Sequence, residues 1–300
     1  MSLQTQYPNA IWFDSAHTGT ESGTFLEPYS SSINTAVNAS TETAPVVIIK
    51  AGTHTLENGA AHLGNTYTSY AGGVTVIGDG DVTLESGASA LDGYAFLYSA
   101  TNVTYTFKNI KFLNNSTGAG GVSRGFMGKD STFNLVLENC SYRVNSTSPQ
   151  RGTFFGGTVT AKNCDFDSYS LFVHASTYLL DASTVNLENC TLYNVKNSFG
   201  GTISGMADQT WILDPTVNAT IKNTIFYAAG STNTTSGLAN SAFSLIAFEN
   251  CCVYSPDSFL DDFTASEDSG TPVLADPQFV DSANGDRRLR PSSPCINAGA

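Results

Sequence analysis

One short phrase recurs six times along the chain, and it constrains the fold more than any other feature of the sequence. Each copy alternates apolar and polar residues, ends in Lys-Asn or Glu-Asn, and resumes with further apolar residues. The asparagines are 24 to 34 residues apart, at Asn109, Asn139, Asn163, Asn189, Asn223 and Asn250. A period of roughly 20 to 50 residues is typical of solenoids, in which each coil buries its apolar side only by stacking on its neighbours. The repeat therefore predicts a stack of coils.

The asparagine of each copy predicts a sharp turn between two strands. Asparagine adopts the left-handed backbone region more readily than other non-glycine residues, and its amide can hydrogen-bond to neighbouring groups. When coils stack, these side chains are expected to form a hydrogen-bonded ladder. The residue after each asparagine should then point into the coil, and these residues are Ile110, Cys140, Cys164, Cys190, Thr224 and Cys251.

Four of the six cysteines are therefore predicted to be small core residues rather than metal ligands or reactive groups. A structural zinc site needs close pairs such as C-x2-C, whereas these four cysteines are 24, 26 and 61 residues apart and have no neighbouring histidine. Side chains stacked in register lie alongside one another, which disfavours a disulfide between coils. Cys252 and Cys295 stand outside the repeat, and the sequence assigns neither.

These features resemble the right-handed parallel β-helix proteins of the pectate-lyase-like superfamily, over essentially the whole chain. AIWFDSAHTGTESGTFLEPYSSSINTAVNAS and VVIIKAGTHTL are similar to the opening of such proteins, and GGVTVIGDGDVTL is similar to their second coil. ADPQFVDSANGDRRLRPSSPCINAGA is similar to the terminal segment of many bacterial and phage members. The resemblance implies an all-β fold, a right-handed parallel β-helix of roughly nine coils with three strands per coil. It says little about activity.

One continuous domain is expected, with an opening segment and short capping helix at 1–45, the β-helix at 46–275 and a closing segment at 276–300. Ile33, Ala36 and Val37 have helical spacing after a run of serines that can cap a helix. Such a helix would cover the open end of the first coil. The third strand of successive coils is predicted at 94–99, 124–129, 152–157, 171–176 and 200–205.

Composition and charge exclude some classes of function. The formal net charge is −13, with only 13 lysines and arginines in 300 residues, so a nucleic acid is not an expected partner. No run approaches the roughly 18 apolar residues of a membrane helix, so no membrane insertion is expected. The amino terminus lacks the basic and apolar regions of a signal peptide, so none is expected in this chain.

Enzymes of this fold that cleave acidic polysaccharides by β-elimination need a positive group to neutralise the uronate and a base to take the C5 proton. The candidates, expected on neighbouring coils, are Arg124, Lys129, Arg151 and His174. For each of them a solvated surface or turn role is the commoner explanation. The paired-aspartate and Gly-His-Gly signatures of polygalacturonases and the tryptophan-flanked Asp-His signature of pectate lyases do not occur in the sequence.

Carboxylates offer a second kind of site. Asp165 and Asp167 alternate onto one side of a strand, where they could bind a ligand or hold Ca²⁺. A looser acidic cluster is a weaker metal candidate, and it contains Asp257, Asp261 and Asp262. Neither has the spacing of a known calcium loop, and a solvated acidic loop is the ordinary explanation. No cofactor other than Ca²⁺ is considered.

Long loops on one side of a solenoid usually carry its contacts, and three such loops are expected at 114–125, 205–217 and 229–241. Trp211 in the second loop could stack on a sugar ring. A tryptophan more often covers the coil beneath its own loop, so that explanation remains the commoner one.

Two functions are compatible with these features. The first is a structural or adhesive β-helix displayed on a virion, tailspike-like or capsid-decorating, or on a cell surface. Its loops would contact a host or environmental glycan, its partners could include other virion proteins, and by analogy with tailspikes it would form a homotrimer. The second is a polysaccharide lyase, epimerase or hydrolase that acts on an acidic polysaccharide. The missing catalytic signatures and the uncharged polar composition favour the first.

Overall fold

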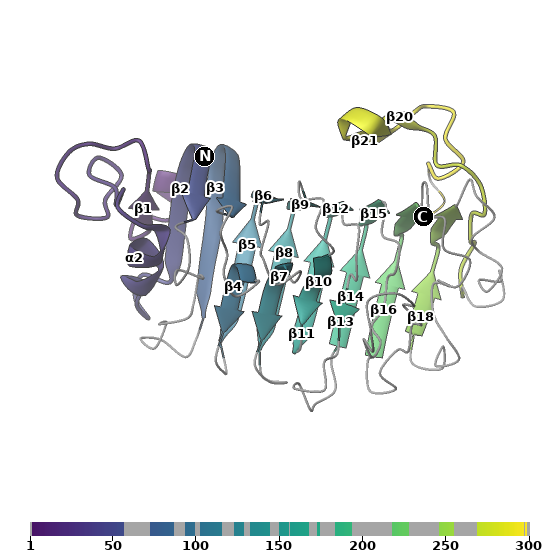
Figure 1. Ribbon diagram of the computed structural model, residues 1–300, viewed down its shortest axis with the longest axis horizontal. Coiled ribbons are helices and arrows are strands. Elements are labelled where there is room, and N and C mark those ends of the chain that lie inside the picture. The colour runs from purple at the N-terminus through teal and green to yellow at the C-terminus, as the bar shows by residue number, and fades with distance from the viewer. Residues whose placement is uncertain are drawn as a thin grey trace.

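The chain folds into a parallel β-helix, as the sequence predicts (Figure 1). The computed structural model describes residues 2–56, 73–86, 94–99, 103–115, 123–128, 133–144, 150–155, 157–167, 173–174, 184–193, 218–227, 246–254, 269–296 and 298. Within these residues the strands form a 15-stranded sheet, a 4-stranded sheet and a 2-stranded sheet. The strand pairs of the two larger sheets are parallel, and the small sheet is antiparallel.

The 15-stranded sheet bends around one corner of the coil. The strands before the corner are β5 (Thr104–Lys108), β8 (Asn134–Glu138), β11 (Thr158–Lys162), β14 (Thr184–Glu188), β16 (Asn218–Lys222) and β18 (Ile246–Glu249). The strands after it are β6 (Lys111–Asn114), β9 (Ser141–Val144), β12 (Asp165–Asp167), β15 (Thr191–Tyr193), β17 (Ile225–Tyr227) and β19 (Cys252–Tyr254). Each strand pairs in register with its equivalent on the next coil.

The first two coils pass through this corner as single long strands, β2 (Val46–Leu56) and β3 (Val74–Ser86). Because β3 pairs with both β5 and β6, it joins the two arms of the sheet. With these strands, eight coils can be followed in the part of the chain that the structure describes, against roughly nine predicted.

A third face completes the coil. It is formed by β4 (Tyr94–Ser99), β7 (Ser123–Gly128), β10 (Gln150–Phe155) and β13 (Val173–His174), which pair side by side (Figure 1). These strands confirm four of the five predicted third strands. The fifth, at 200–205, lies outside the described residues.

The amino-terminal end of the stack is closed by a short helix. The elements here are α1 (Leu3–Gln6), β1 (Ile11–Phe13) and α2 (Ile33–Asn38), and β1 pairs with β2. The side chain of Ser32 caps α2 by accepting a hydrogen bond from the backbone of Asn34 at 3.2 Å. The helix buries Ile33, Ala36 and Val37 in the same core as the first coil, which confirms the predicted capping helix.

The asparagine ladder is present at the corner. All six turn asparagines have a positive φ, between 49° and 57°. From Asn139 to Asn223, each side-chain Nδ2 donates to the Oδ1 of the asparagine one coil earlier, at 3.1 to 3.2 Å. Gly78 lies in β3, on the coil that precedes Asn109. A Cβ on Gly78 would lie 2.3 Å from the carbonyl oxygen of Asn109, so glycine is needed there. The ladder turns the sheet at the same point on successive coils.

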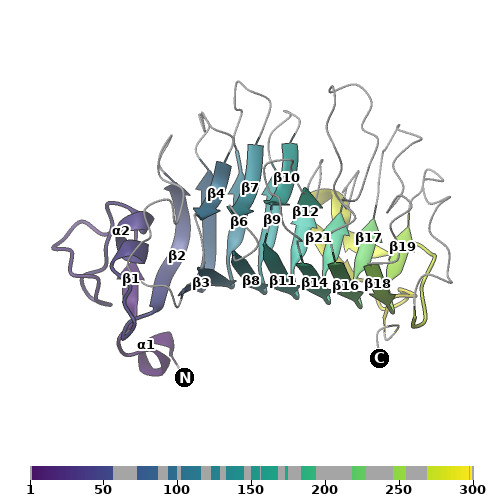
Figure 2. The same ribbon diagram turned by 90° about the horizontal axis from the view of Figure 1, so that it is seen from below.

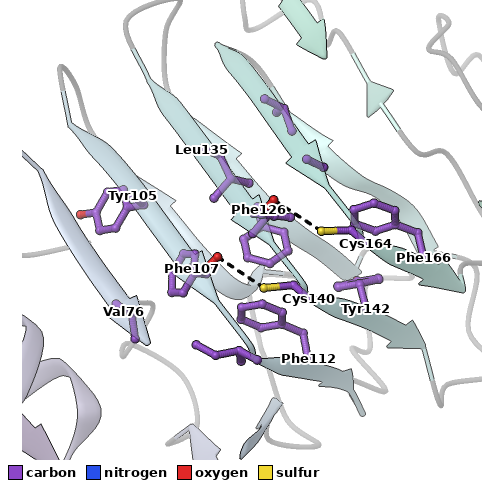
Figure 3. Close-up of a cluster of buried hydrophobic side chains, with 14 of the residues drawn as sticks. Val76, Tyr105, Phe107, Phe112, Phe126, Leu135, Cys140, Tyr142, Cys164 and Phe166 are labelled. Atoms are coloured by element: carbon purple, nitrogen blue, oxygen red, sulfur yellow. Dashed lines mark hydrogen bonds between the residues drawn. The ribbon is translucent and has the colours of Figure 1, made fainter. Parts of the chain in front are cut away.

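The residue after each asparagine is buried, as predicted. The single S–H of Cys140 is shared between the carbonyl oxygens of Glu138 and Phe107, each 3.4 Å from Sγ (Figure 3). Cys164, Cys190 and Cys251 have the same arrangement, and we call these four the ladder cysteines. All six cysteines are free thiols. Burial raises the pKa of the Cys140 thiol well above its ordinary value, which keeps it protonated as a donor. The ladder cysteines therefore pack the core.

A ladder of alternating charge runs beside the asparagines. The residues immediately before them are Lys108, Glu138, Lys162, Glu188, Lys222 and Glu249, which are aligned on neighbouring strands. They form three ion pairs, at 2.7, 2.7 and 2.5 Å. Each pair is partly exposed and contributes only about 0 to 1 kcal/mol. A coil stacked out of order would bring like charges together, so the alternation favours the observed order of coils.

We predict that Asn163→Ala lowers the free energy of unfolding by about 1 to 3 kcal/mol, because alanine is strained at positive φ and the ladder loses a rung. Asn163→Gly should cost less, since glycine adopts this φ without strain. Cys164→Ala should cost about 0.5 to 1.5 kcal/mol, as removal of one buried heavy atom does. Chemical denaturation of the three variants checks the order. Equal losses for alanine and glycine at position 163 would contradict the role assigned to the turn.

Candidate functional site

The carboxyl-terminal part of the chain folds back over the outside of the coils. After the last coil, the backbone N–H groups of Val253 and Val273 donate to the carbonyl oxygens of Val273 and Cys251, each at 2.9 Å. The chain then forms the hairpin β20 (Phe279–Asp281) and β21 (Asp286–Leu289), joined by a 3₁₀ turn at Ser282–Asn284. Figures 1 and 2 show this yellow segment lying back along the stack. We name residues 276–298 the closing strap.

Arg287 holds the closing strap against the β-helix. Its Nη1 lies 2.6 Å from both carboxylate oxygens of Asp165, and its Nη2 donates to Asp167. Its guanidinium also stacks on the ring of Tyr193, with Cζ 4.2 Å from the ring centroid. The side chain of Arg287 is only 4% exposed. Charge-assisted, bidentate contacts of this kind are among the stronger polar interactions in proteins.

The strap contacts several coils on either side of Arg287. The Nη2 of Arg143 donates to the carbonyl oxygen of Gly285 at 2.9 Å. Gly285 has a φ of 83°, which favours glycine, and a Cβ there would lie 2.1 Å from that same Nη2, so Arg143 would have to move. Phe279 packs against Tyr193 and Tyr227, whose rings are stacked 5.0 Å apart. The strap thus spans the outer positions of β9, β12, β15 and β17.

The predicted pair Asp165 and Asp167 does lie on one side of its strand, and the group it faces is Arg287 of the same chain. Burial raises the pKa of Asp165, while the charge and hydrogen bonds of Arg287 lower it. Within the described residues, the buried Nε of Arg287 has no hydrogen-bond partner. A ligand or Ca²⁺ at these carboxylates would have to compete with the guanidinium, and that role stays a prediction.

Two open hollows lie along the asparagine corner. The first has a volume of about 360 Å³ and is lined by Asn109, Asn139 and Asn163 together with Asp81, Lys111 and Ser141. The second has a volume of about 440 Å³ and is lined by Asn189, Asn223 and Asn250 together with Thr191, Arg287 and Cys295. Asn163 and Asn189 are joined by a 3.2 Å hydrogen bond, so the hollows adjoin neighbouring rungs of the ladder.

The charged groups in these hollows are already paired. Lys111 Nζ lies 2.7 Å from Asp81 in the first hollow, and Arg287 is held by two carboxylates in the second. The remaining polar side chains in the lining are asparagine amides, serine and threonine hydroxyls, and the thiols of Cys252 and Cys295. Such walls suit a neutral ligand that is rich in hydrogen-bonding groups.

Three of the four predicted catalytic residues belong to the four-stranded third face. Arg124 in β7 is aligned with Gly152 in β10, next to Arg151. His174 in β13 is aligned with Phe155 and therefore lies further along the strands than the two arginines. Their backbones share one sheet on neighbouring coils, as expected. Lys129 lies outside the described residues.

The other candidate residues cannot be placed. Trp211 and the acidic residues Asp257, Asp261 and Asp262 lie outside the described residues, as do most positions of the three long loops. In the part that is described, no group of three or more His, Cys, Asp or Glu side chains has the geometry to hold a metal ion.

Sequence analysis predicted a closing segment at 276–300 and the pair Asp165 and Asp167, but it did not predict that the segment folds back onto this pair through Arg287. A usable signal was present, because the fourth residue after the asparagine is tyrosine in the last three copies of the repeat: Tyr193, Tyr227 and Tyr254. This run of outward aromatic residues next to the charged Asp167 indicates a covered surface. Nothing in the repeat identifies Arg287 as the residue that covers it.

In comparisons with known proteins, no family model, no curated protein and no solved structure matches this chain. The fold assignment rests on strand pairing and on the asparagine ladder. The helices that the structure describes are all too short or too polar to span a bilayer.

We predict that Arg287→Met weakens docking of the closing strap by about 3 kcal/mol, because it leaves two partly buried carboxylates without their cation. Arg288→Met is the matched control, since Arg288 is 81% exposed and its pair with Asp286 contributes little. Hydrogen exchange of residues 279–289 measures the free energy of local opening. Equal exchange in the two variants would contradict the assigned role.

The defect of Arg287→Met should depend on pH. Without the arginine, the pKa of Asp165 rises further, because burial is then opposed only by the charge of Arg143. In the variant, Asp165 therefore binds a proton more readily when the strap is docked than when it is open. The stability of the docked strap is therefore greatest in acid and falls as the pH rises through that pKa. The difference from the wild type should shrink at acidic pH and grow toward neutral pH.

Proposed function

We propose that this chain is a structural and adhesive β-helix of the pectate-lyase-like type, displayed on a virion or a cell surface, and that it contacts a glycan along its asparagine corner. The observation that carries the proposal is the pair of hollows beside the ladder. Their lining combines side-chain amides and hydroxyls with aliphatic groups, and the charged groups that line them are paired. A homotrimer and contacts with other virion proteins belong to the same proposal.

The ladder leaves hydrogen-bonding capacity for a ligand. A side-chain amide has two N–H donors and two acceptor lone pairs. A rung such as Asn139 uses one donor toward Asn109 and one lone pair toward Asn163. In Asn139, Asn163 and Asn189, which each use one donor and one lone pair within the ladder, the second donor and the second lone pair can bond to a ligand or water. Sugar hydroxyls both donate and accept, so a linear glycan matches a row of such amides.

The charge of the protein favours a neutral glycan over an acidic one. The formal net charge is −13, and Lys111 and Arg287 in the hollows are already neutralised by aspartates. A uronate polymer would be repelled over long range unless cations bridged it. The parallel coils repeat at about 4.8 Å, which presents equivalent groups at regular intervals along a rigid rod.

We predict that Ser141→Trp and Thr191→Trp, one in each hollow, weaken binding to neutral oligosaccharides by about tenfold or more, which is a loss of about 1.4 kcal/mol. Each indole fills space that the sugar would occupy. Thr106→Trp, on an outward position before the corner, is the control and should bind like the wild type. A glycan array followed by titration calorimetry measures the affinities. If the wild type binds no neutral glycan, or the hollow variants bind normally, the corner is not the binding surface.

A polysaccharide lyase, epimerase or hydrolase is the second candidate. The observation that favours it is the shared sheet of Arg124, Arg151 and His174, which could present a positive group and a base to one uronate. His174 is displaced along the strands from Arg124 and Arg151, and this displacement weighs against the three residues acting on one sugar.

We predict no new reducing ends and no unsaturated uronate when the purified protein is incubated with a broad panel of acidic polysaccharides, with and without Ca²⁺. The missing catalytic signatures are the reason for this expectation. Product formation that is lost in Arg124→Gln and kept in Arg288→Met would establish the enzyme and displace the structural proposal.

A further inference from the structure

Two cysteines outside the core ladder meet where the closing strap returns to the last coil. Cys252 belongs to β19 and is 3% exposed, whereas Cys295 lies in the final turn of the strap and is partly exposed. Both line the 440 Å³ hollow. The interaction between their side chains raises the pKa of Cys252 and lowers that of Cys295. The fold therefore brings together two thiols that are 43 residues apart in the sequence.

Backbone contacts fix both cysteines in place. The N–H of Cys252 donates to the carbonyl oxygen of Thr224 at 3.0 Å, and its Sγ donates to the carbonyl oxygen of Ala275 at 3.5 Å. The N–H of Cys295 donates to the hydroxyl of Ser293 at 3.1 Å. Ser293 is buried and donates its own N–H to the carbonyl oxygen of Arg290 at 2.9 Å. Little loop entropy is left to lose when a bond joins the two sulfurs.

The ladder cysteines differ from this pair in position and in access. Cys140, Cys164, Cys190 and Cys251 are stacked inside the coil, where each Sγ donates to backbone carbonyl oxygens. All four are buried in the hydrophobic core. Cys295 is the one member of the six that is not buried.

We propose that Cys252 and Cys295 form a disulfide bond that fastens the closing strap to the last coil. A low-molecular-weight disulfide such as glutathione disulfide supplies the oxidation. The thiolate of Cys295 attacks it and releases one glutathione thiolate, which takes up the proton that Cys295 lost. The sulfur of Cys252 then attacks the mixed disulfide, forms the Cys252–Cys295 bond and releases the second glutathione, which takes up the proton of Cys252. Two thiols are oxidised, and one glutathione disulfide is reduced to two thiols.

The local environment suits these roles. The interaction with the Cys252 side chain, followed by the hydrogen bond from Ser293, lowers the pKa of Cys295, which raises the fraction of attacking thiolate. The bond would close a loop that contains the whole strap hairpin and the Arg287 contact. Opening of the strap would then be limited to the residues within this loop, and the wall of the hollow would stay in place.

The test uses the full chain. Purified protein is treated with glutathione disulfide or with dithiothreitol, denatured, alkylated and weighed by mass spectrometry. We expect six alkylated cysteines after dithiothreitol and four after oxidation, since two of the six form the bond. In a non-reducing tryptic digest, the peptide that begins at Leu289 should stay joined to the peptide that holds Cys252.

Three variants assign the partners. Oxidation should leave all five remaining thiols free in Cys295→Ser. In Cys252→Ser it should form no internal disulfide, and Cys295 should instead retain one glutathione as a mixed disulfide. Cys190→Ser is the matched control, because Cys190 lines the same hollow, and it should fall from five thiols to three. Six free thiols in the oxidised wild type, or a bond from Cys295 to Cys190 or Cys251, would overturn the proposal. The wild-type measurement stands even if one of the variants fails to fold.

Discussion

The left-handed asparagine turn is the constraint on which the rest of this structure depends. A positive φ at the same place on successive coils bends each strand at the same point, so the strands on either side stay in register. Register then fixes which way every neighbouring side chain faces. The residue after the turn points inward and becomes cysteine or another small core residue, and the residue before it becomes a member of the charge ladder. The ladder hydrogen bonds make each turn depend on the next.

The strand register that aligns the core side chains also aligns the side chains on the outer surface of the coils. The second and fourth residues after each turn project outward, and they form two rows along the stack, which the strap crosses at Arg143, Asp165, Asp167, Tyr193 and Tyr227. A contact such as Arg287 to Asp165 spans 122 residues of sequence, yet it needs only one correctly placed hairpin. Because these rows are rigid, a single buried arginine can position the whole strap.

The sequence predicts what repeats and misses what occurs once. The ladder at Asn109 to Asn250, the core cysteines and the capping helix follow from local rules of turn, burial and periodicity, which apply coil by coil. The pairing of Arg287 with Asp165 does not, because it depends on where a non-repeating segment crosses the rows. The alternation of lysine and glutamate that begins at Lys108 is likewise a property of the repeat and can be found in the sequence. Lys129 and Trp211 lie outside the described residues and remain predictions.

The closing strap makes the carboxyl-terminal end of the asparagine corner different from its amino-terminal end. Over the early coils the hollow is bounded by the coils alone, with Asp81 and Lys111 paired at its edge. Over the late coils the strap adds Arg287, Leu289 and Cys295 as a wall. A ligand that lies along the ladder would therefore meet amides throughout and a closed side only at the carboxyl-terminal end. A repeating rod by itself offers no preferred register to a repeating ligand, and the strap makes one end of the ladder different from the other; in the proposed glycan-binding role, this difference would set the register.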